Sequence, residues 1–258
     1  MKTLRQAQGK LPKVLVLKAD GINRDEEMAY AFKVAGAYPQ IVHINELREN
    51  KQSLENFQIL ALPGGFAYGD DIVSGKILAI ELTSFLGAEM KKFIERKDTA
   101  IIGVCNGFQV LVRTGLLPFR KIGEMDVTLT NNDSGHFECR WVKVKVNKNN
   151  NSKFLKGMDE KILWLPIAHG EGKFFTDEKT LKEVEDNNLV AFRYMDNPNG
   201  SLNDIVGVTD STGRILGMMP HPECFIRVEQ HPNWRRGNIK VDGLPLFENI
   251  VDFVKNTK

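Results

Sequence analysis

The chain has 258 residues, of which 42% are hydrophobic and 26% charged, a balance typical of a globular protein with a sizeable core. Its 35 basic and 33 acidic residues leave a net charge of +2, which gives no support to a nucleic-acid or membrane-surface role. No apolar run approaches the roughly 20 residues of a membrane span, and residues 1–12 lack the apolar core of a signal peptide. Three widely spaced cysteines suit a reducing compartment, so we expect a cytoplasmic protein.

The first half of the chain alternates short apolar runs with helix-length segments, which is typical of βαβ units around a parallel sheet. We expect strands over 13–19, 40–44, 57–62 and 100–102, and helices over 26–35 and 74–96. Right-handed crossovers place the loops after these strands at one edge of the sheet, where open α/β proteins bind ligands.

The second half shows the period-two alternation of antiparallel strands. Strands are expected over 128–132, 139–146, 162–168, 189–194, 205–208 and 215–219, with a closing helix over 246–254. The sequence therefore predicts an α/β fold: an open, mostly parallel, doubly wound sheet with flanking helices and an antiparallel extension. No repeat or clean linker interrupts the chain, so we expect an N-terminal extension over 1–12 and one domain over 13–258.

The stretch 100–114 contains Gly-x-Cys-x-Gly, the cysteine version of the nucleophile elbow. An apolar strand precedes the motif and a helical pattern follows it, so Cys105 lies on a sharp turn at the positive end of a helix dipole. That position favours the thiolate form, and the flanking glycines let neighbouring backbone approach. A small buried cysteine at an ordinary strand–helix turn is the alternative that this motif alone leaves open.

The loop over 63–71 contains three glycines and the aromatic residues Phe66 and Tyr68. Paired glycines can leave backbone N–H groups pointing at a ligand, although a long turn would have the same composition. Asp70 and Asp71 could hold a metal or could simply be solvated. The pair at 235–236, two arginines, could clamp a phosphate or lie in a solvated turn. The sequence has no P-loop motif and no Cys-x-x-Cys zinc spacing.

A cysteine nucleophile needs a base, and His221 is the best candidate because it follows a predicted buried strand. Glu223 lies two residues on. In an extended segment the two side chains project from the same side, so the carboxylate can orient the imidazole. His169, with Glu171 at the same spacing, is the rival. A solvated histidine in a surface turn is the alternative reading of His221.

The remaining histidines give weaker signals. His43 lies within a predicted strand and is expected to be structural. His136 and His231 fall in polar loops without a recognisable partner. Trp141 and Trp164 are expected to fill core space.

Three motifs together resemble the triad-type (class I) glutamine amidotransferases: Pro-Gly-Gly-Phe with Tyr-Gly-Asp, Gly-Val-Cys-Asn-Gly-Phe-Gln, and His-Pro-Glu. In finer detail the chain resembles the glutaminase subunit of the purine-biosynthesis enzyme that converts formylglycinamide ribonucleotide to its amidine. The segments that carry this finer resemblance are 21–27, 132–141, 166–172, 196–201 and 230–234. The resemblance extends from about residue 13 to the C-terminus.

The resemblance implies a role for each motif. Cys105 would attack the carboxamide carbon of glutamine, His221 would take the thiol proton and return it to ammonia, and Glu223 would orient His221. The backbone N–H groups of Gly65 and Asn106 would form the oxyanion hole.

The resemblance also implies a substrate contact and partners. Gln109 would help to hold the amino-acid end of glutamine. The ammonia would pass to a larger synthetase subunit, and a small third subunit usually completes the assembly. ATP and magnesium are expected in the large subunit, and no cofactor or metal is expected in this chain.

Two departures and two alternatives remain. Cys224 stands where members of the family commonly carry arginine, and Ala19-Asp20 precede a glycine where related sequences often have proline. One alternative is another thiol enzyme of this architecture, such as a peptidase, against which Glu223 and Gln109 argue. The other is a catalytically silent binding subunit, against which the intact triad argues.

Overall fold

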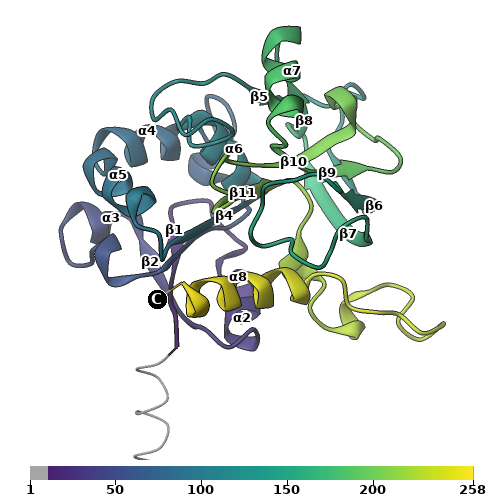
Figure 1. The fold of residues 1–258 in the computed structure, drawn as a ribbon, viewed down its shortest axis with the longest axis horizontal. Coiled ribbons are helices and arrows are strands. Elements are labelled where there is room, and N and C mark those ends of the chain that lie inside the picture. The colour runs from purple at the N-terminus through teal and green to yellow at the C-terminus, as the bar shows by residue number, and fades with distance from the viewer. Residues whose placement is uncertain (1–10, 258) are drawn as a thin grey trace, which may run out of the picture.

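The computed structural model in Figure 1 describes residues 11–257, so most of the predicted extension over 1–12 lies outside the described residues. Within them, one sheet has the strand order β2-β1-β3-β4-β11-β10-β9-β6-β7. A separate two-stranded sheet pairs β5 (Thr128–Thr130) with β8 (Lys173–Phe175).

One half of the large sheet is parallel and the other antiparallel. The parallel half comprises β1 (Lys13–Lys18), β2 (Tyr38–His43), β3 (Ile59–Leu62), β4 (Ala100–Val104) and β11 (Ile215–Met218). The antiparallel half continues through β10 (Ile205–Thr209), β9 (Val190–Tyr194), β6 (Glu138–Val146) and β7 (Ile162–His169). The predicted fold class, a mostly parallel core with an antiparallel extension, is confirmed.

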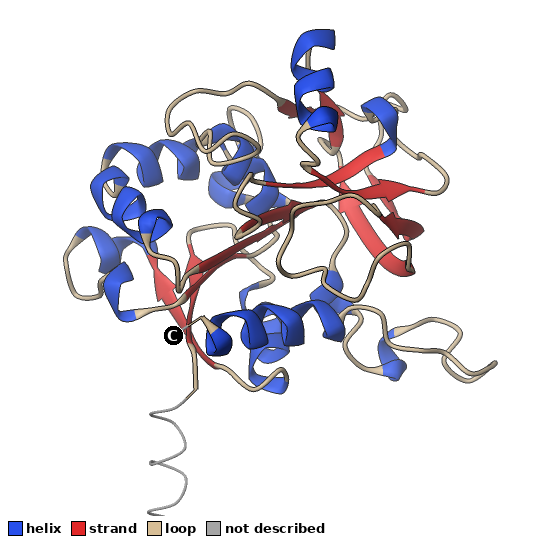
Figure 2. Cartoon of the chain, viewed as in Figure 1, coloured by secondary structure: helices blue, strands red, loops and turns tan. Residues whose placement is uncertain are grey.

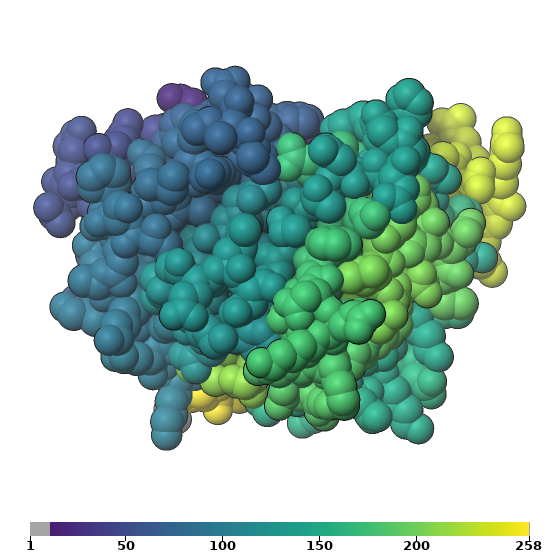
Figure 3. Space-filling view, turned by 90° about the horizontal axis from the view of Figure 1, so that it is seen from above, coloured from purple at the N-terminus to yellow at the C-terminus, as the bar shows by residue number. Residues whose placement is uncertain are grey.

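Helices cover both faces of the parallel half, which explains why its strands read as continuous apolar runs. Helices α4, α5 and α6 lie on one face, and α2 and α8 lie on the other (Figures 1 and 2). The rings of Phe32 and Phe247 join α2 to α8 with centroids 5.0 Å apart. Seen from above, segments of the first half of the chain, in blue and teal, lie beside green segments of the second half (Figure 3).

The α-helices have these bounds: α2 (Asp25–Val34), α3 (Ile44–Arg48), α4 (Lys76–Ser84), α5 (Gly87–Glu95), α6 (Asn106–Arg113), α7 (Glu178–Asp186) and α8 (Leu244–Asn256). The short 3-10 helices are η1 (Leu54–Asn56), η2 (Ala67–Asp70), η3 (Leu202–Asp204), η4 (Pro222–Cys224) and η5 (Val228–Gln230). Across the described part of the chain, none of the helices has the length and apolar character needed to cross a membrane.

The prediction of a single helix over 74–96 is wrong, because the chain breaks between α4 and α5. The hydroxyl of Thr83 donates back to the carbonyl oxygen of Ala79 at 2.9 Å, an interaction that bends helices. Gly87, a poor helix former, follows at the break. Helix α5 then begins anew, with the N–H of Met90 donating to the carbonyl oxygen of Leu86 at 2.8 Å.

The loops after β1, β3, β4 and β11 meet at one sheet edge, because these four strands are adjacent and parallel. The N–H of Phe66 donates to the carbonyl oxygen of Gly21 at 2.9 Å, and the N–H of Arg24 donates to that of Gly64 at 3.2 Å. These bonds join the loop after β3 to the loop after β1. The predicted triad and oxyanion residues lie in this group of loops or at the start of α6, directly after β4, whereas His169 lies at the end of β7.

Candidate active site

Cys105 occupies the turn between β4 and α6, as the elbow motif predicts. Its backbone has φ 51° and ψ −109°, a conformation that residues other than glycine rarely adopt. The N–H of Cys105 donates to the carbonyl oxygen of Met218 at 2.8 Å, which ties the turn to β11. The N–H of Gln109 donates to the carbonyl oxygen of Cys105 at 3.0 Å and begins the helix. The sulfur is thus held at the N-terminus of α6.

The flanking glycines are required by close packing. A Cβ atom added at Gly107 would lie 2.0 Å from the carbonyl oxygen of Leu62, and one at Gly103 would lie 2.5 Å from that of Gly107. Both distances are far inside van der Waals contact. Only glycine therefore lets α6 approach β3 and β4 closely enough to form the elbow.

His221 and Glu223 form a buried pair directly after β11. The Nδ1 atom of His221 lies 2.6 Å from the Oε1 atom of Glu223, whose side chain is fully buried. The predicted extended geometry of this segment is wrong: residues 222–224 form the 3-10 helix η4. The N–H of Phe225 donates to the carbonyl oxygen of Pro222 at 3.0 Å and closes this turn, so the pairing arises from a tight turn and not from a strand.

The imidazole of His221 lies beside the elbow. A Cβ atom added at Gly64 would lie 2.6 Å from the Cε1 atom of His221 and 3.4 Å from the Cβ atom of Cys105, so one glycine touches both. Burial lowers the pKa of His221, but the charges of Glu223 and Cys105 outweigh that effect and raise the pKa to about 10. The Nε2 atom is buried and has no hydrogen-bond partner within residues 11–257. It is therefore free to exchange a proton beside the sulfur.

The sulfur itself points to a different acceptor in this structure. The thiol of Cys105 donates to the carbonyl oxygen of Ala168 at the end of β7, with 3.6 Å between the sulfur and the oxygen. Catalytic contacts in hydrolases are often long before substrate binds, so this geometry is compatible with later transfer of the thiol proton to His221.

His169, the rival base, has its ring nitrogens engaged elsewhere. Its Nδ1 atom lies 3.1 Å from the Oδ1 atom of Asn132, and its Nε2 atom lies 3.4 Å from the hydroxyl of Tyr194. Burial and the charge of His221 lower its pKa to about 4. His169 is thus a neutral residue that supports the wall of the site, whereas His221 holds the carboxylate partner.

The lowered pKa of His169 predicts a stability change in acid. The histidine is neutral in the folded chain, and its pKa in the unfolded chain is about 6.5. Its contribution to the free energy of unfolding is therefore full above pH 6.5 and is lost as pH falls towards 4. The loss should reach about 3 kcal/mol of unfolding free energy. We expect denaturant titrations of His169→Gln to show a shallower fall between pH 6.5 and 4. The exposed His136→Gln should follow the parent chain, and parallel slopes for all three proteins would contradict this assignment.

The two predicted oxyanion donors flank the elbow. Gly65 has φ +143° in the loop after β3, and Asn106 is the first residue of α6. Within the part of the chain that the structure describes, neither backbone N–H donates a hydrogen bond. Unused donors beside a nucleophile are the groups that stabilise a developing oxyanion.

The side chain of Gln109 is buried in an internal network. Its Oε1 atom accepts from the side-chain amide of Asn106 at 3.0 Å, and its Nε2 atom donates to the carbonyl oxygen of Glu171 at 2.5 Å. Asn106 also donates to Asp70 at 3.2 Å. Gln109 therefore links the elbow to the loop at Glu171, and Asn106 links it to the loop at Asp70. The predicted contact of Gln109 with glutamine stays a prediction.

His231 is fully buried, and the prediction of a polar loop without a partner is wrong: its ring packs 4.5 Å from Trp141 and 4.3 Å from Trp164, between centroids. Arg235 and Arg236 are exposed, and the guanidinium of Arg235 lies 4.6 Å from the ring centroid of the neighbouring tryptophan.

One group of potential metal ligands lies at the site. Single donor atoms of His221, Glu223 and Cys224 all fall within 4.8 Å of one another. Two of them already form the 2.6 Å hydrogen bond, so a metal would break the imidazole–carboxylate pair. Burial and the charge of Glu223 raise the pKa of Cys224, which keeps it a neutral thiol. We assign no metal to this cluster.

Some supporting residues were missed by sequence reasoning. The amide of Asn132 donates to the carbonyl oxygens of His136 and His169 at 2.9 and 2.8 Å, which fixes the corner after β7. The guanidinium of Arg113 donates to the carbonyl oxygen of Ser74 at 2.6 Å and lies 3.7 Å from a carboxylate oxygen of Glu171. Although 132–141 carries part of the family resemblance, no local signal assigns these roles to Asn132 and Arg113, because His169, Ser74 and Glu171 are distant from them in the sequence.

Comparison with known proteins identifies the family. A family model described as a CobB/CobQ-like glutamine amidotransferase domain matches residues 11–254. The chain is 43% identical over 254 residues to phosphoribosylformylglycinamidine synthase subunit PurQ of Dehalococcoides mccartyi, covering 94% of this chain and 98% of that protein. The chain belongs to the PurQ family of glutamine amidotransferases. PurQ of Methanococcus maripaludis strain C5 is 44% identical over 269 residues, covering 94% of this chain and 98% of that protein.

A solved structure agrees with this assignment. A chain in the structure of PurLQS from Thermotoga maritima superposes with a TM-score of 0.75 at 30% identity, covering 94% of this chain and 99% of that chain. The similarity confirms the resemblance drawn from the motifs and the predicted fold. Membership of this family also removes the alternative of an unrelated thiol hydrolase on the same architecture.

Proposed function

We propose that this chain is the glutaminase subunit of phosphoribosylformylglycinamidine synthase. It hydrolyses glutamine to glutamate and ammonia, and the ammonia is used by a synthetase subunit to convert formylglycinamide ribonucleotide to the amidine. The observation that carries the proposal is the arrangement around Cys105. A cysteine in a strained elbow lies beside His221, whose Nδ1 atom is held by buried Glu223 and whose Nε2 atom has no partner among the described residues.

The first step forms a thioester. The sulfur of Cys105 attacks the carboxamide carbon of glutamine while His221 holds the thiol proton on Nε2. The raised pKa of His221 favours this imidazolium, and Glu223 stabilises it. We assign the backbone N–H groups of Gly65 and Asn106 to the oxyanion of the tetrahedral intermediate, because neither donates a hydrogen bond among the described residues.

Collapse of this intermediate releases ammonia. His221 donates its proton to the leaving nitrogen, the C–N bond breaks, and a γ-glutamyl thioester remains on Cys105. Water then attacks the thioester with His221 as base, and glutamate leaves as the thiol re-forms.

The proposed assembly includes two further subunits. The similar Thermotoga maritima chain comes from a structure of PurLQS, which supports association of this chain with a large synthetase subunit and a small third subunit. ATP and magnesium belong to the large subunit in this proposal, since this sequence has no P-loop motif. The free thiols of Cys105, Cys139 and Cys224 suit a cytoplasmic location.

Transfer of the amide nitrogen tests the proposal. The chain is combined with its synthetase and small subunit, ATP, magnesium and formylglycinamide ribonucleotide, and glutamine labelled with nitrogen-15 at the amide is added. We expect the label in the amidine and an equal amount of glutamate. An assembly that uses free ammonium but leaves labelled glutamine intact would show a catalytically silent binding subunit instead.

A further inference from the structure

A chain of three side chains connects the glycine-rich loop (63–71) to the outside of the molecule. The hydroxyl of Tyr68 donates to the Oε2 atom of Glu81 at 2.5 Å, and the Nη1 atom of Arg48 donates to the Oε1 atom of the same carboxylate at 3.0 Å. Glu81 lies on α4 and is largely buried, while Arg48 lies at the end of α3. The carboxylate therefore uses one oxygen for each partner.

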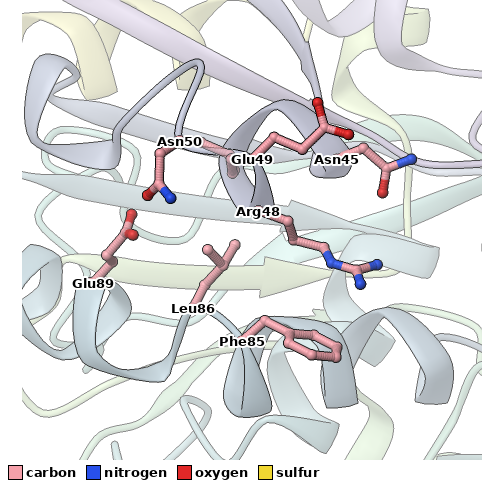
Figure 4. A pocket seen from close by; sticks show the side chains of 8 residues that line it. Asn45, Arg48, Glu49, Asn50, Phe85, Leu86 and Glu89 are labelled. Carbon is pink, nitrogen blue, oxygen red and sulfur yellow. The ribbon is translucent and has the colours of Figure 1, made fainter.

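The outer end of this chain is also fixed. The guanidinium of Arg48 stacks on Phe85, with its central carbon 4.3 Å from the ring centroid. Both residues line a surface cavity of about 490 Å³ between α3 and the break after α4, together with Leu86 and Glu89 (Figure 4). Arg48 is anchored on two sides, so it holds Glu81 in one orientation.

The inner end of the chain lies in strained backbone. Tyr68 and Asp70 have φ of +55° and +54°, and Gly69 between them has φ +69°. Two of these three are not glycine, and such residues keep left-handed conformations only where their surroundings hold them. The N–H of Tyr68 donates to the carbonyl oxygen of Asp20 at 2.7 Å, so both its backbone and its hydroxyl are tethered.

The tether lies three residues from the predicted oxyanion donor Gly65. Between them, the N–H of Phe66 donates to the carbonyl oxygen of Gly21, and the N–H of Ala67 donates to the side chain of Asn106 at 3.3 Å. On the other side, the N–H of Arg24 donates to the carbonyl oxygen of Gly64 at 3.2 Å. With Tyr68 fixed by Glu81, the peptide that carries the Gly65 N–H is therefore held on both sides. An oxyanion donor stabilises the transition state only if it is already in place.

We propose that Tyr68, Glu81 and Arg48 form a brace that holds the glycine-rich loop with the Gly65 N–H aimed at the oxyanion. The proposal rests on the proposed function and adds three positioning residues to it. None of the three touches the reacting atoms. Loss of the brace should therefore weaken stabilisation of the transition state and leave binding of glutamine largely unchanged.

The main test uses Tyr68→Phe, which removes one hydroxyl and keeps the ring, in the assembly with the synthetase and small subunit. We expect kcat for glutamine to fall about tenfold, less than the roughly 100- to 1000-fold loss typical of a deleted oxyanion donor, with KM changed less than twofold. Synthesis from added ammonium should be unchanged. Tyr30→Phe is the matched control, since Tyr30 is exposed on α2 and its hydroxyl makes no hydrogen bond among the described residues.

A second measurement distinguishes loss of oxyanion stabilisation from a general loss of ligand affinity. Glutamate γ-semialdehyde forms a tetrahedral hemithioacetal with a thiol, so its affinity reports the oxyanion hole. We expect Tyr68→Phe to weaken its binding about tenfold, while glutamine binding, measured with Cys105→Ala present in both proteins, stays the same. Equal losses of affinity for the two ligands, or an unchanged kcat, would contradict the proposed brace.

Substitutions of Glu81 complete the test and cover the case in which Tyr68→Phe does not fold. Glu81→Ala should lower kcat as much as Tyr68→Phe, and the double variant should fall no further, because one interaction is being removed twice. Glu81→Gln keeps one oxygen for the two donors Tyr68 and Arg48, so its kcat should lie between that of Glu81→Ala and that of the parent chain. Losses of kcat that add in the double variant, or a Glu81→Gln variant no more active than Glu81→Ala, would contradict the proposal. A parent assembly without glutamine-dependent turnover would instead contradict the proposed function.

Discussion

Cys105→Ala is expected to lower glutamine-dependent amidation by about 10⁴-fold or more, because no thioester can form without the sulfur. Synthesis from added ammonium should remain at the parent level, since that chemistry belongs to the synthetase subunit. Both rates are measured in the same assembled enzyme with formylglycinamide ribonucleotide and ATP. The paired measurement separates loss of the nucleophile from loss of assembly.

Cys139→Ala is the matched control for that experiment. Cys139 is exposed on β6 and has no place in the proposed mechanism, so its substitution should leave both rates unchanged. If Cys105→Ala keeps glutamine-dependent activity and Cys139→Ala loses it, the assignment of Cys105 as the nucleophile is wrong. A loss of both rates in Cys105→Ala would show a structural defect.

Glu223→Gln is expected to give the second largest loss, roughly 10²- to 10⁴-fold in kcat. The amide removes the negative charge that raises the pKa of His221 and can turn an N–H towards Nδ1, which selects the wrong tautomer. Titration of His221 by NMR should show a lower pKa in this variant. Glu229→Gln, an exposed neighbour in η5, should change neither property.

The sign of the pKa change is the critical outcome for Glu223. If kcat falls but the pKa of His221 stays where it is, Glu223 acts through packing and not through its charge. If the pKa falls and kcat is retained, imidazolium formation does not limit the reaction.

The elbow could be predicted from sequence because its determinants are local. An apolar strand, two glycines around Cys105 and a helical pattern occupy one short stretch, and the structure shows the strained turn at that cysteine. The order of parallel strands then brings His221 to the same edge, since β11 lies next to β4. The sequence predicted that His221 follows a buried strand, but not that this strand pairs with β4, because β5 to β10 lie between the two strands in the chain.

The supporting contacts could not be predicted, because they join distant segments. His231 looks like a loop residue until β6 and β7 pair and place Trp141 and Trp164 around it. Asn132 meets His169 from 37 residues away. The break at 85–86 was missed because the apolar pattern continues across it, although Gly87 was a visible signal.

The most direct test of the account is the identity of the alkylated residue after treatment with 6-diazo-5-oxonorleucine, a glutamine analogue that traps the attacking nucleophile. The protein is digested and the adduct is located by mass spectrometry, with and without excess glutamine. We predict a single adduct on Cys105 that glutamine suppresses and that His221→Ala slows. An adduct on Cys139 or Cys224, with Cys105 unmodified, would contradict the assignment of the active site.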